Sequence, residues 1–176
     1  MTAEELLERY AAGERDFRNI QDIGFGNSDS FLSQVNLSGI DLSGSVLEER
    51  FMERTNFTKA ILRETNFFES VLDGAIFREA DLTNASLYFA DLDRADLTHA
   101  KLIEANLGGA SMIGANLTGA DLTGADLHGT YLDGANLTDA NLFEAFIGDQ
   151  EAGFAYLETA IFCNTIMPDG TIRTDT

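Results

Sequence analysis

The sequence predicts an all-β solenoid, a coil of short sides and repeated corners whose turns stack along one axis. The main observation is a five-residue repeat between Ala80 and Leu142, in which Ala is followed by Asp or Asn and then by Leu. The small and the large apolar residue lie two apart, so strand-like alternation points both to one side. A corner must separate successive pairs. Because one coil cannot bury its own apolar face, neighbouring coils have to stabilise it.

The repeat resembles the A-(D/N)-L-x-x motif of the pentapeptide repeat family. Its central position recurs every fifth residue, in unbroken phase, from Leu32 to Met167. The resemblance implies a right-handed quadrilateral β-helix with four pentapeptides per coil, in which every fourth centre stacks. This gives about seven coils and a rod about 34 Å long at the usual strand spacing. One predicted column of centres contains Leu42, Leu62, Leu82, Leu102, Leu122, Leu142 and Phe162.

The chain begins with a predicted capping helix. Thr2 and Glu5 fit a capping box, and Gly13 is a suitable helix stop. Since a solenoid has an open end that needs cover, we expect this helix to pack over the first coil. A partner-binding helix is the alternative. The expected segments are a capping helix (1–14), a degenerate first coil or loop (15–29), the repeat β-helix (30–167) and a C-terminal tail (168–176).

Three places break the regular pattern. The phase slips between Arg18 and Ser30, which predicts an irregular first coil or a loop. Arg50 occupies a small inward position, and burying an unpaired guanidinium is costly. We therefore expect a local distortion that lets Arg50 reach solvent or an acidic neighbour. Gln150 also fills an inward position, which predicts a bulge over residues 149–154.

Charge and hydropathy exclude several classes of protein. The formal net charge is −19 at pH 7, and no Lys or Arg lies between Leu102 and Ile172. Direct nucleic-acid binding is not expected, because it needs cations that displace counterions from phosphates. The sequence contains no apolar run of membrane-spanning length. Its start lacks the basic and apolar regions of a secretory signal, so a cytoplasmic protein is expected.

The residues that could carry chemistry are not grouped in the sequence. The recurring Asp and Asn residues are interpreted as structural, since paired catalytic carboxylates need a shared cleft and metal ligands need to converge. His99 and His128 fall on different faces, and Cys163 is a lone outward thiol. The sequence therefore predicts no enzyme activity, no cofactor and no metal site.

Apolar side chains occur at outward positions where polar residues are usual. They map to one corner and the adjoining face over successive coils, which indicates a partner-binding strip or a homodimer contact. The alternative is that the strip is covered by the loop near Gly24 or by the N-terminal helix. The strip consists of Phe51, Phe68, Val71, Tyr88 and Phe89.

The first functional hypothesis is a rigid protein–protein interaction module with an unidentified protein partner. The second follows from the resemblance, because some pentapeptide repeat proteins resemble B-form DNA and bind DNA gyrase in its place. Duplex DNA carries about 20 charges over 34 Å, close to the net charge of this chain. Such a protein would modulate gyrase or protect it from quinolones. The candidate acidic surface is Asp121, Asp126, Asp133, Asp139 and Glu144. A regulator of some other target is a third reading.

Overall fold

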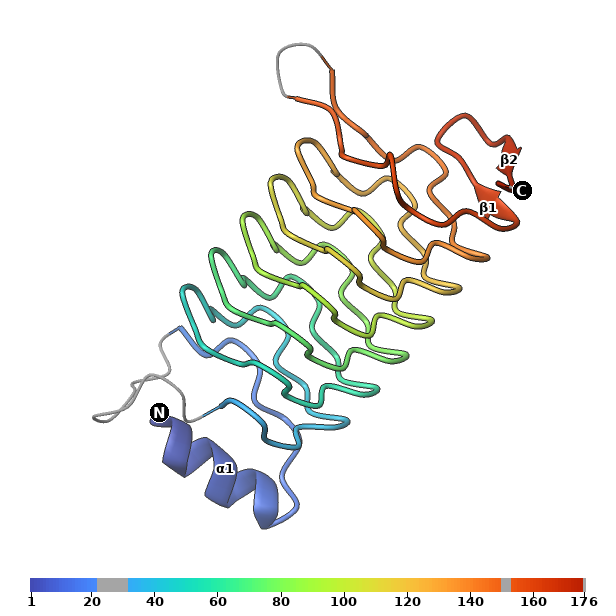
Figure 1. Ribbon diagram of the computed structural model, residues 1–176. Coiled ribbons are helices and arrows are strands. Elements are labelled where there is room, and N and C mark those ends of the chain that lie inside the picture. Colours follow the sequence, from blue (N-terminus) through green and yellow to red (C-terminus); the bar gives the residue numbers. More distant parts are fainter. Residues whose placement is uncertain (22–31, 150–152, 176) are drawn as a thin grey trace.

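The computed structural model describes residues 1–21, 32–149 and 153–175. Figure 1 shows a rod of stacked coils with the helix at one end and a short antiparallel hairpin at the other. The helix is α1 (Ala3–Ala11), and the hairpin strands are β1 (Thr165–Ile166) and β2 (Ile172–Arg173).

Parallel single-residue bridges hold the coils together. Residue 81 illustrates the pattern: Asp81 N donates to Ala60 O at 2.9 Å, and the next residue, Leu82, donates to Lys101 O of the following coil at 2.8 Å. A corner follows each pair of extended residues, so the pairing is of β type, whereas regular strands in the described ranges are limited to β1 and β2. One complete ladder runs through Asn36, Asn56, Ile76, Asp96, Asn116, Asn136 and Ile161.

The predicted inward positions form the core. The Ala and Leu ladders are almost fully buried along the rod. In the first coils Phe replaces Leu, and the rings of Phe57 and Phe77 stack with centroids 5.1 Å apart. Polar residues at the small inward position are also satisfied, as Thr65 Oγ1 donates to Leu42 O at 3.0 Å. Burial is thus combined with hydrogen bonding, as expected for an interior without water.

The Asp or Asn before each centre has the structural role that the sequence predicts. Its side-chain oxygen accepts a hydrogen bond from the backbone N–H two residues later, inside the corner. Asp121 Oδ1, for example, accepts from Thr123 N at 3.1 Å, and Asn136 Oδ1 accepts from Thr138 N at 3.0 Å. Either residue type serves, because only the oxygen is used in this bond.

The predicted column that ends in Phe162 is wrong at its last step. From Asn36 onward, bridges join residues twenty apart up to Asp126 and Phe146, but Tyr131 pairs with Tyr156 and Asn136 with Ile161. Phe162 therefore lies over Leu137 instead of Leu142. Five extra residues leave the coil between Phe146 and Tyr156, which agrees with the predicted bulge, although residues 150–152 lie outside the described ranges.

Two further irregular places are described in part. At Arg50 the coil keeps the bond from Val71 N to Arg50 O at 2.8 Å, but Arg50 N donates to Ser70 Oγ at 3.2 Å, whereas Thr55 N of the next repeat donates to Met52 O. Asn19 N donates to Ser43 O at 2.9 Å, so the start of the segment predicted as an irregular first coil or a loop pairs with the first regular coil. The remainder of that predicted loop, residues 22–31 with Gly24 among them, lies outside the described ranges.

Both ends of the rod are covered. Thr2 Oγ1 accepts from Glu5 N at 3.1 Å and caps α1, which buries Leu6 and joins the first coils through Tyr10 Oη, a donor to Ser38 O at 2.8 Å. The predicted packing of this helix is confirmed. At the other end, the guanidinium of Arg173 in β2 lies 3.7 Å from the ring centroid of Phe162. No helix in the described part of the chain is long and apolar enough to cross a membrane.

Candidate functional site

The predicted apolar strip divides between two neighbouring rows of the rod. Phe51 and Val71 bridge each other in one ladder, while Phe68 and Tyr88 stack in the next row with ring centroids 6.2 Å apart. Phe89 lies at the corner between these rows, and its ring centroid is 4.3 Å from that of Tyr88. Phe51 is 40% exposed and Phe89 is 52% exposed, whereas the other three are half-buried.

Glycine makes room for a third ring in the Tyr88 row. His128 lies two coils above Tyr88, and their ring centroids are 5.8 Å apart because Gly108 of the intervening coil has no side chain. A Cβ on Gly108 would lie only 2.3 Å from His128 Cε1. Gly109 in the same way leaves space for the ring of Phe89, whose Cε1 would be 2.4 Å from an added Cβ. Tyr88, Phe89 and His128 thus form one continuous aromatic surface.

This surface continues into a depression of about 300 Å³, which we call the aromatic groove. Tyr131 and Tyr156 form one wall, with their rings parallel and centroids 4.6 Å apart. Tyr131 is 42% exposed and Tyr156 is 49% exposed. The groove is lined by Tyr88, Phe89, Gly109, His128, Gly129, Tyr131, Gly153 and Tyr156.

Of the eight residues that line this site, sequence reasoning proposed Tyr88 and Phe89 and missed the other six. Tyr131 belongs to the Phe51 ladder, so extending the twenty-residue step from Phe51 would have found it. His128 is likewise in the Tyr88 row. No such signal points to Tyr156, because it reaches the ladder only through the five extra residues that precede it.

The candidate acidic residues are distributed around the rod. Asp121 bridges Asn141, and Asp126 bridges Phe146 in a different ladder. Asp133 follows Tyr131 in a third, and Asp139 and Glu144 occupy corners with φ of 55° and 59°. Of these carboxylates, Asp126 belongs to the aromatic surface, since its Oδ1 lies 2.8 Å from His128 Nδ1. The geometry does not bring the five carboxylates into one row.

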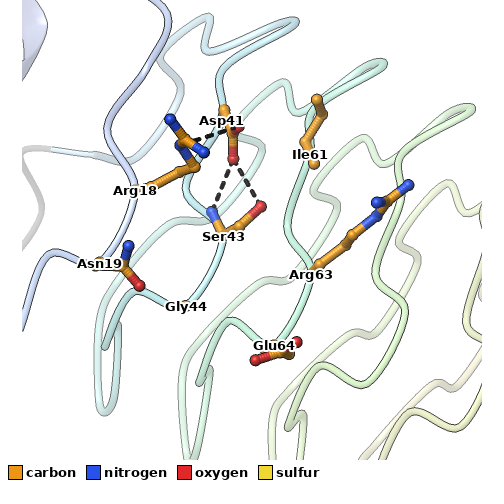
Figure 2. Close-up of a pocket in the computed structure, with 8 residues that line it drawn as sticks. All are labelled: Arg18, Asn19, Asp41, Ser43, Gly44, Ile61, Arg63 and Glu64. Carbon is orange, nitrogen blue, oxygen red and sulfur yellow. Dashed lines mark hydrogen bonds and ion pairs between the residues drawn. The ribbon is translucent and has the colours of Figure 1, made fainter.

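A second depression, of about 370 Å³, lies near the N-terminal end (Figure 2). Two arginines line it, but each has a carboxylate partner: Arg18 Nη2 lies 2.6 Å from Asp16 Oδ2, and Arg63 Nη2 lies 2.6 Å from Asp81 Oδ2. The hydrogen bond from Arg18 lowers the pKa of Asp16 to about 2. The arginine charges are therefore already used within the protein, and this pocket is a weaker candidate for an anion site.

The described residues contain no cluster of three or more His, Cys, Asp and Glu side chains that could hold a metal ion. Cys163 is exposed, as expected. The aromatic groove offers rings, glycine backbone and a histidine–carboxylate pair. These groups suit binding of another molecule better than bond breaking, which needs a nucleophile or paired acid and base aimed at one point.

Comparison with known sequences places the repeats in an established group. The family model for pentapeptide repeats matches eight copies, over residues 36–72, 52–87, 60–98, 90–129 and 120–147. Members of this family fold as right-handed quadrilateral β-helices. A search of proteins with curated functions finds no match.

Solved structures of similar proteins come from several sources. HetL, a pentapeptide repeat protein involved in heterocyst differentiation regulation from the cyanobacterium Nostoc sp. strain PCC 7120, is 30% identical over 98% of this chain and 100% of its own, with a TM-score of 0.35. A pentapeptide repeat protein of the Arabidopsis thaliana thylakoid lumen is 34% identical over 66% of this chain and 75% of its own, with a TM-score of 0.38. QnrB1, a plasmid-mediated fluoroquinolone resistance protein, is 21% identical over 80% of this chain and 82% of its own, with a TM-score of 0.41.

Proposed function

The chain belongs to the pentapeptide repeat family, and from this premise we propose that it is a non-enzymatic interaction module that binds a partner protein through the aromatic groove. The main observation is that the rings of Tyr88, Phe89, His128, Tyr131 and Tyr156, from successive coils, line one groove. In this proposal the coils turn in the right-handed sense of the family, and the rod holds the rings at fixed spacing. Rigid aromatic side chains lose little conformational entropy on binding, which is why they dominate many protein interfaces.

The position of the groove supports this proposal. Gly109 and Gly129 line the depression; the Phe89 ring lies beside Gly109, whereas no side chain comes within 4 Å of the Cβ position of Gly129. Outward positions on the other rows carry mainly polar residues, such as Thr118 and Thr138. An apolar surface that is not needed for burial lowers solubility, and a binding role accounts for its presence.

Partner capture tests the proposal. Wild-type protein and the double variant Tyr88→Ser/Phe89→Ser are immobilised and exposed to extract of the source cells. Loss of a captured protein, with an unchanged circular dichroism spectrum and melting temperature, supports the groove as the interface. If the variant unfolds, these rings belong to the core and the proposal is wrong. The matched control is Thr118→Ser/Thr138→Ser on a different row, which is expected to retain capture.

The acidic DNA mimic that acts on DNA gyrase is the second candidate. It is favoured by the absence of Lys and Arg between Leu102 and Ile172, which leaves the carboxylates of the last coils without cationic neighbours in the sequence. A surface of this charge competes with DNA for a basic groove, and the competition weakens with salt.

A supercoiling assay with purified gyrase, with and without a quinolone, tests this candidate. The variant should replace Asp121, Asp126 and Asp133 by Asn, because Asn keeps the oxygen that the first two use to hold their corners. Charge reversal would remove this oxygen and confound binding with folding. Salt-sensitive inhibition that the variant loses would support mimicry, and absence of any effect would exclude it. The matched control neutralises three corner acids of the first coils: Glu49, Glu64 and Glu69.

A further inference from the structure

We infer that the aromatic groove accepts an arginine side chain presented by an extended segment of the partner protein. The inference rests on the proposed function, since it names the chemistry of the segment that the same groove would bind. Three features of the structure support it: the charge around the groove, the arrangement of its rings and its glycine floor.

Three carboxylates lie close in the sequence to side chains that line the groove. Asp126 lies beside His128, Asp133 follows Tyr131 by two residues, and Glu158 follows Tyr156 by two. Asp133 Oδ1 accepts from Thr159 Oγ1 at 3.1 Å, and Glu158 is exposed. No Lys or Arg occurs in the sequence from residue 102 to residue 172 that could offset these charges.

In the first coils, carboxylates form ion pairs with arginines. There, arginines pair with acids of the neighbouring coil: Arg63 with Asp81, and Arg78 Nε with Asp96 Oδ2 at 2.5 Å. Asp126, beside His128, has the same repeat position as Asp81 and Asp96, but the sequence around it contains no Lys or Arg. A partner that supplies a guanidinium would complete the same type of pair, which favours arginine over a neutral or acidic segment.

The rings suit a planar cation. The ring of Tyr131 lies parallel to that of Tyr156, and both exposed side chains line the groove. The chain itself stacks arginine on aromatic rings at both ends: Arg15 Cζ lies 3.9 Å from the Tyr10 centroid, and Arg173 Cζ lies 3.7 Å from that of Phe162. A guanidinium over a tyrosine ring is attracted by its negative face, and this attraction increases as water is excluded.

The floor suits an extended backbone. Gly109 and Gly129 lie in adjacent coils, and a Cβ on Gly129 would lie 3.9 Å from Gly109 Cα. The ring of Phe89 occupies the space beside Gly109, but no side chain lies within 4 Å of the Cβ position of Gly129, so a peptide strand could approach the coil closely at Gly129. The segments outside the described ranges, residues 22–31 and 150–152, contain no Lys or Arg, so they could not supply the cation themselves.

The experiment uses the full-length protein and a fluorescent nine-residue glycine–serine peptide with three arginines. Fluorescence anisotropy measures affinity, and amide resonances of Gly109 and Gly129 report the binding position. The same peptide with citrulline in place of arginine keeps the shape and removes the charge. We expect citrulline to weaken binding about tenfold, as does Tyr131→Ser/Tyr156→Ser, in line with a desolvated cation–ring contact.

Charge-matched variants separate local recognition from general attraction. The double variant Asp133→Asn/Glu158→Gln should weaken the affinity for the arginine peptide at least threefold. Asp121→Asn/Asp139→Asn removes the same charge from other rows and should leave affinity within about twofold of the wild type. Equal effects of the two pairs, or equal binding of arginine and citrulline peptides, would overturn the inference.

A proline-rich peptide without cations is the remaining probe. If it shifts Gly109 and Gly129 while the arginine peptide does not, the groove is an interface of another chemistry: the inference fails and the proposed function stands. If the two glycines shift only with protein concentration, in step with dimerisation by sedimentation, the occupant is a second copy. If the Tyr131/Tyr156 variant neither alters peptide binding nor loses partner capture, both proposals fail.

Discussion

Residues 36–104 and residues 105–147 build the same coil from different side chains. In the first region the corner residue is usually charged, as at Lys59 (φ 58°) and Glu64 (φ 55°). In the second it is mostly glycine, as at Gly119 (φ 65°) and Gly124 (φ 66°). The first region has Phe57, Phe67 and Phe77 among its centres and contains arginine–carboxylate pairs, while the second has mainly Leu centres, no Phe centre and no Lys or Arg.

The difference teaches what the corner glycines provide beyond backbone freedom. Lys59 and Glu64 adopt the same left-handed corner without glycine, so the corner alone does not require it. Glycine instead removes a side chain and leaves a place for a ring from the coil below, as Gly109 does for Phe89 and Gly119 for His99. The glycines of the second region thereby make room for rings that belong to the last coils of the first region.

The largest expected effect is the loss of stability when a Phe centre of the first region or a Leu centre of the second region is replaced by Ala. Phe77 and Leu117 are buried centres in the same column. Replacing Phe77 by Ala should reduce the free energy of unfolding by about 3–5 kcal/mol, and Leu117→Ala by about 2–4 kcal/mol. The Phe77 change also removes ring contacts with Phe57 (5.1 Å) and Phe67 (6.4 Å). Urea unfolding measures both variants, and an equal or smaller loss for Phe77→Ala would contradict the ring contribution.

A smaller loss of stability is expected at the corner glycines, where two variants distinguish backbone strain from displacement of a neighbouring ring. Gly134 has φ of +66° with open space around its absent Cβ, so Gly134→Ala should lower stability by about 1 kcal/mol through strain alone. Gly109→Ala has the same strain and also displaces the Phe89 ring, so we expect about 2 kcal/mol. Thermal melts compare the two variants. Identical melting temperatures would mean that the ring relocates without loss.

The smallest effect concerns a carboxylate beside the boundary between the regions. Burial, then the charges of Asp93 and Asp73, raise the pKa of Asp91. Its ionised form therefore opposes folding above that pKa, and the penalty disappears as the pH falls through it. Asp91→Asn keeps the acceptor for Asp93 N and should raise the melting temperature at pH 7 by about 1–2 °C.

The same comparison is repeated at pH 3, where Asp91 is protonated and the variant should lose its advantage. A gain that persists at pH 3 would point to packing instead of charge. The shift is kept small because the carboxyl is still partly hydrated, so solvent screens much of its repulsion.

Much of this fold could be predicted because its rules are local. The five-residue period gives the inward positions, and Thr2 with Glu5 gives the start of α1. The displacement of Phe162 could not be predicted, since five added residues preserve the phase that the sequence displays. The sequence predicts a disturbance at Arg50, and there the backbone keeps its pairing with Val71 while Arg50 N donates to the side chain of Ser70.

The candidate site was predictable only in part. Tyr88 and Phe89 stand out because apolar residues are unusual at outward positions. The contribution of His128 depends on the missing side chain of Gly108, a relation across two coils. Tyr156 joins Tyr131 only after the register changes, so its place required the three-dimensional pairing.

The register change has a wider consequence, because it makes the repeat behave like a reading frame. At both ends of the rod a step of twenty-five residues replaces one of twenty, between Asp16 and Asp41 and between Tyr131 and Tyr156, and every inward residue beyond it still faces inward. Segments whose lengths are multiples of five can therefore be spliced into a corner without inverting the coils that follow. An insertion of two residues would shift the five-residue phase and expose the downstream core. New loops can therefore be gained here only in lengths that are multiples of five residues.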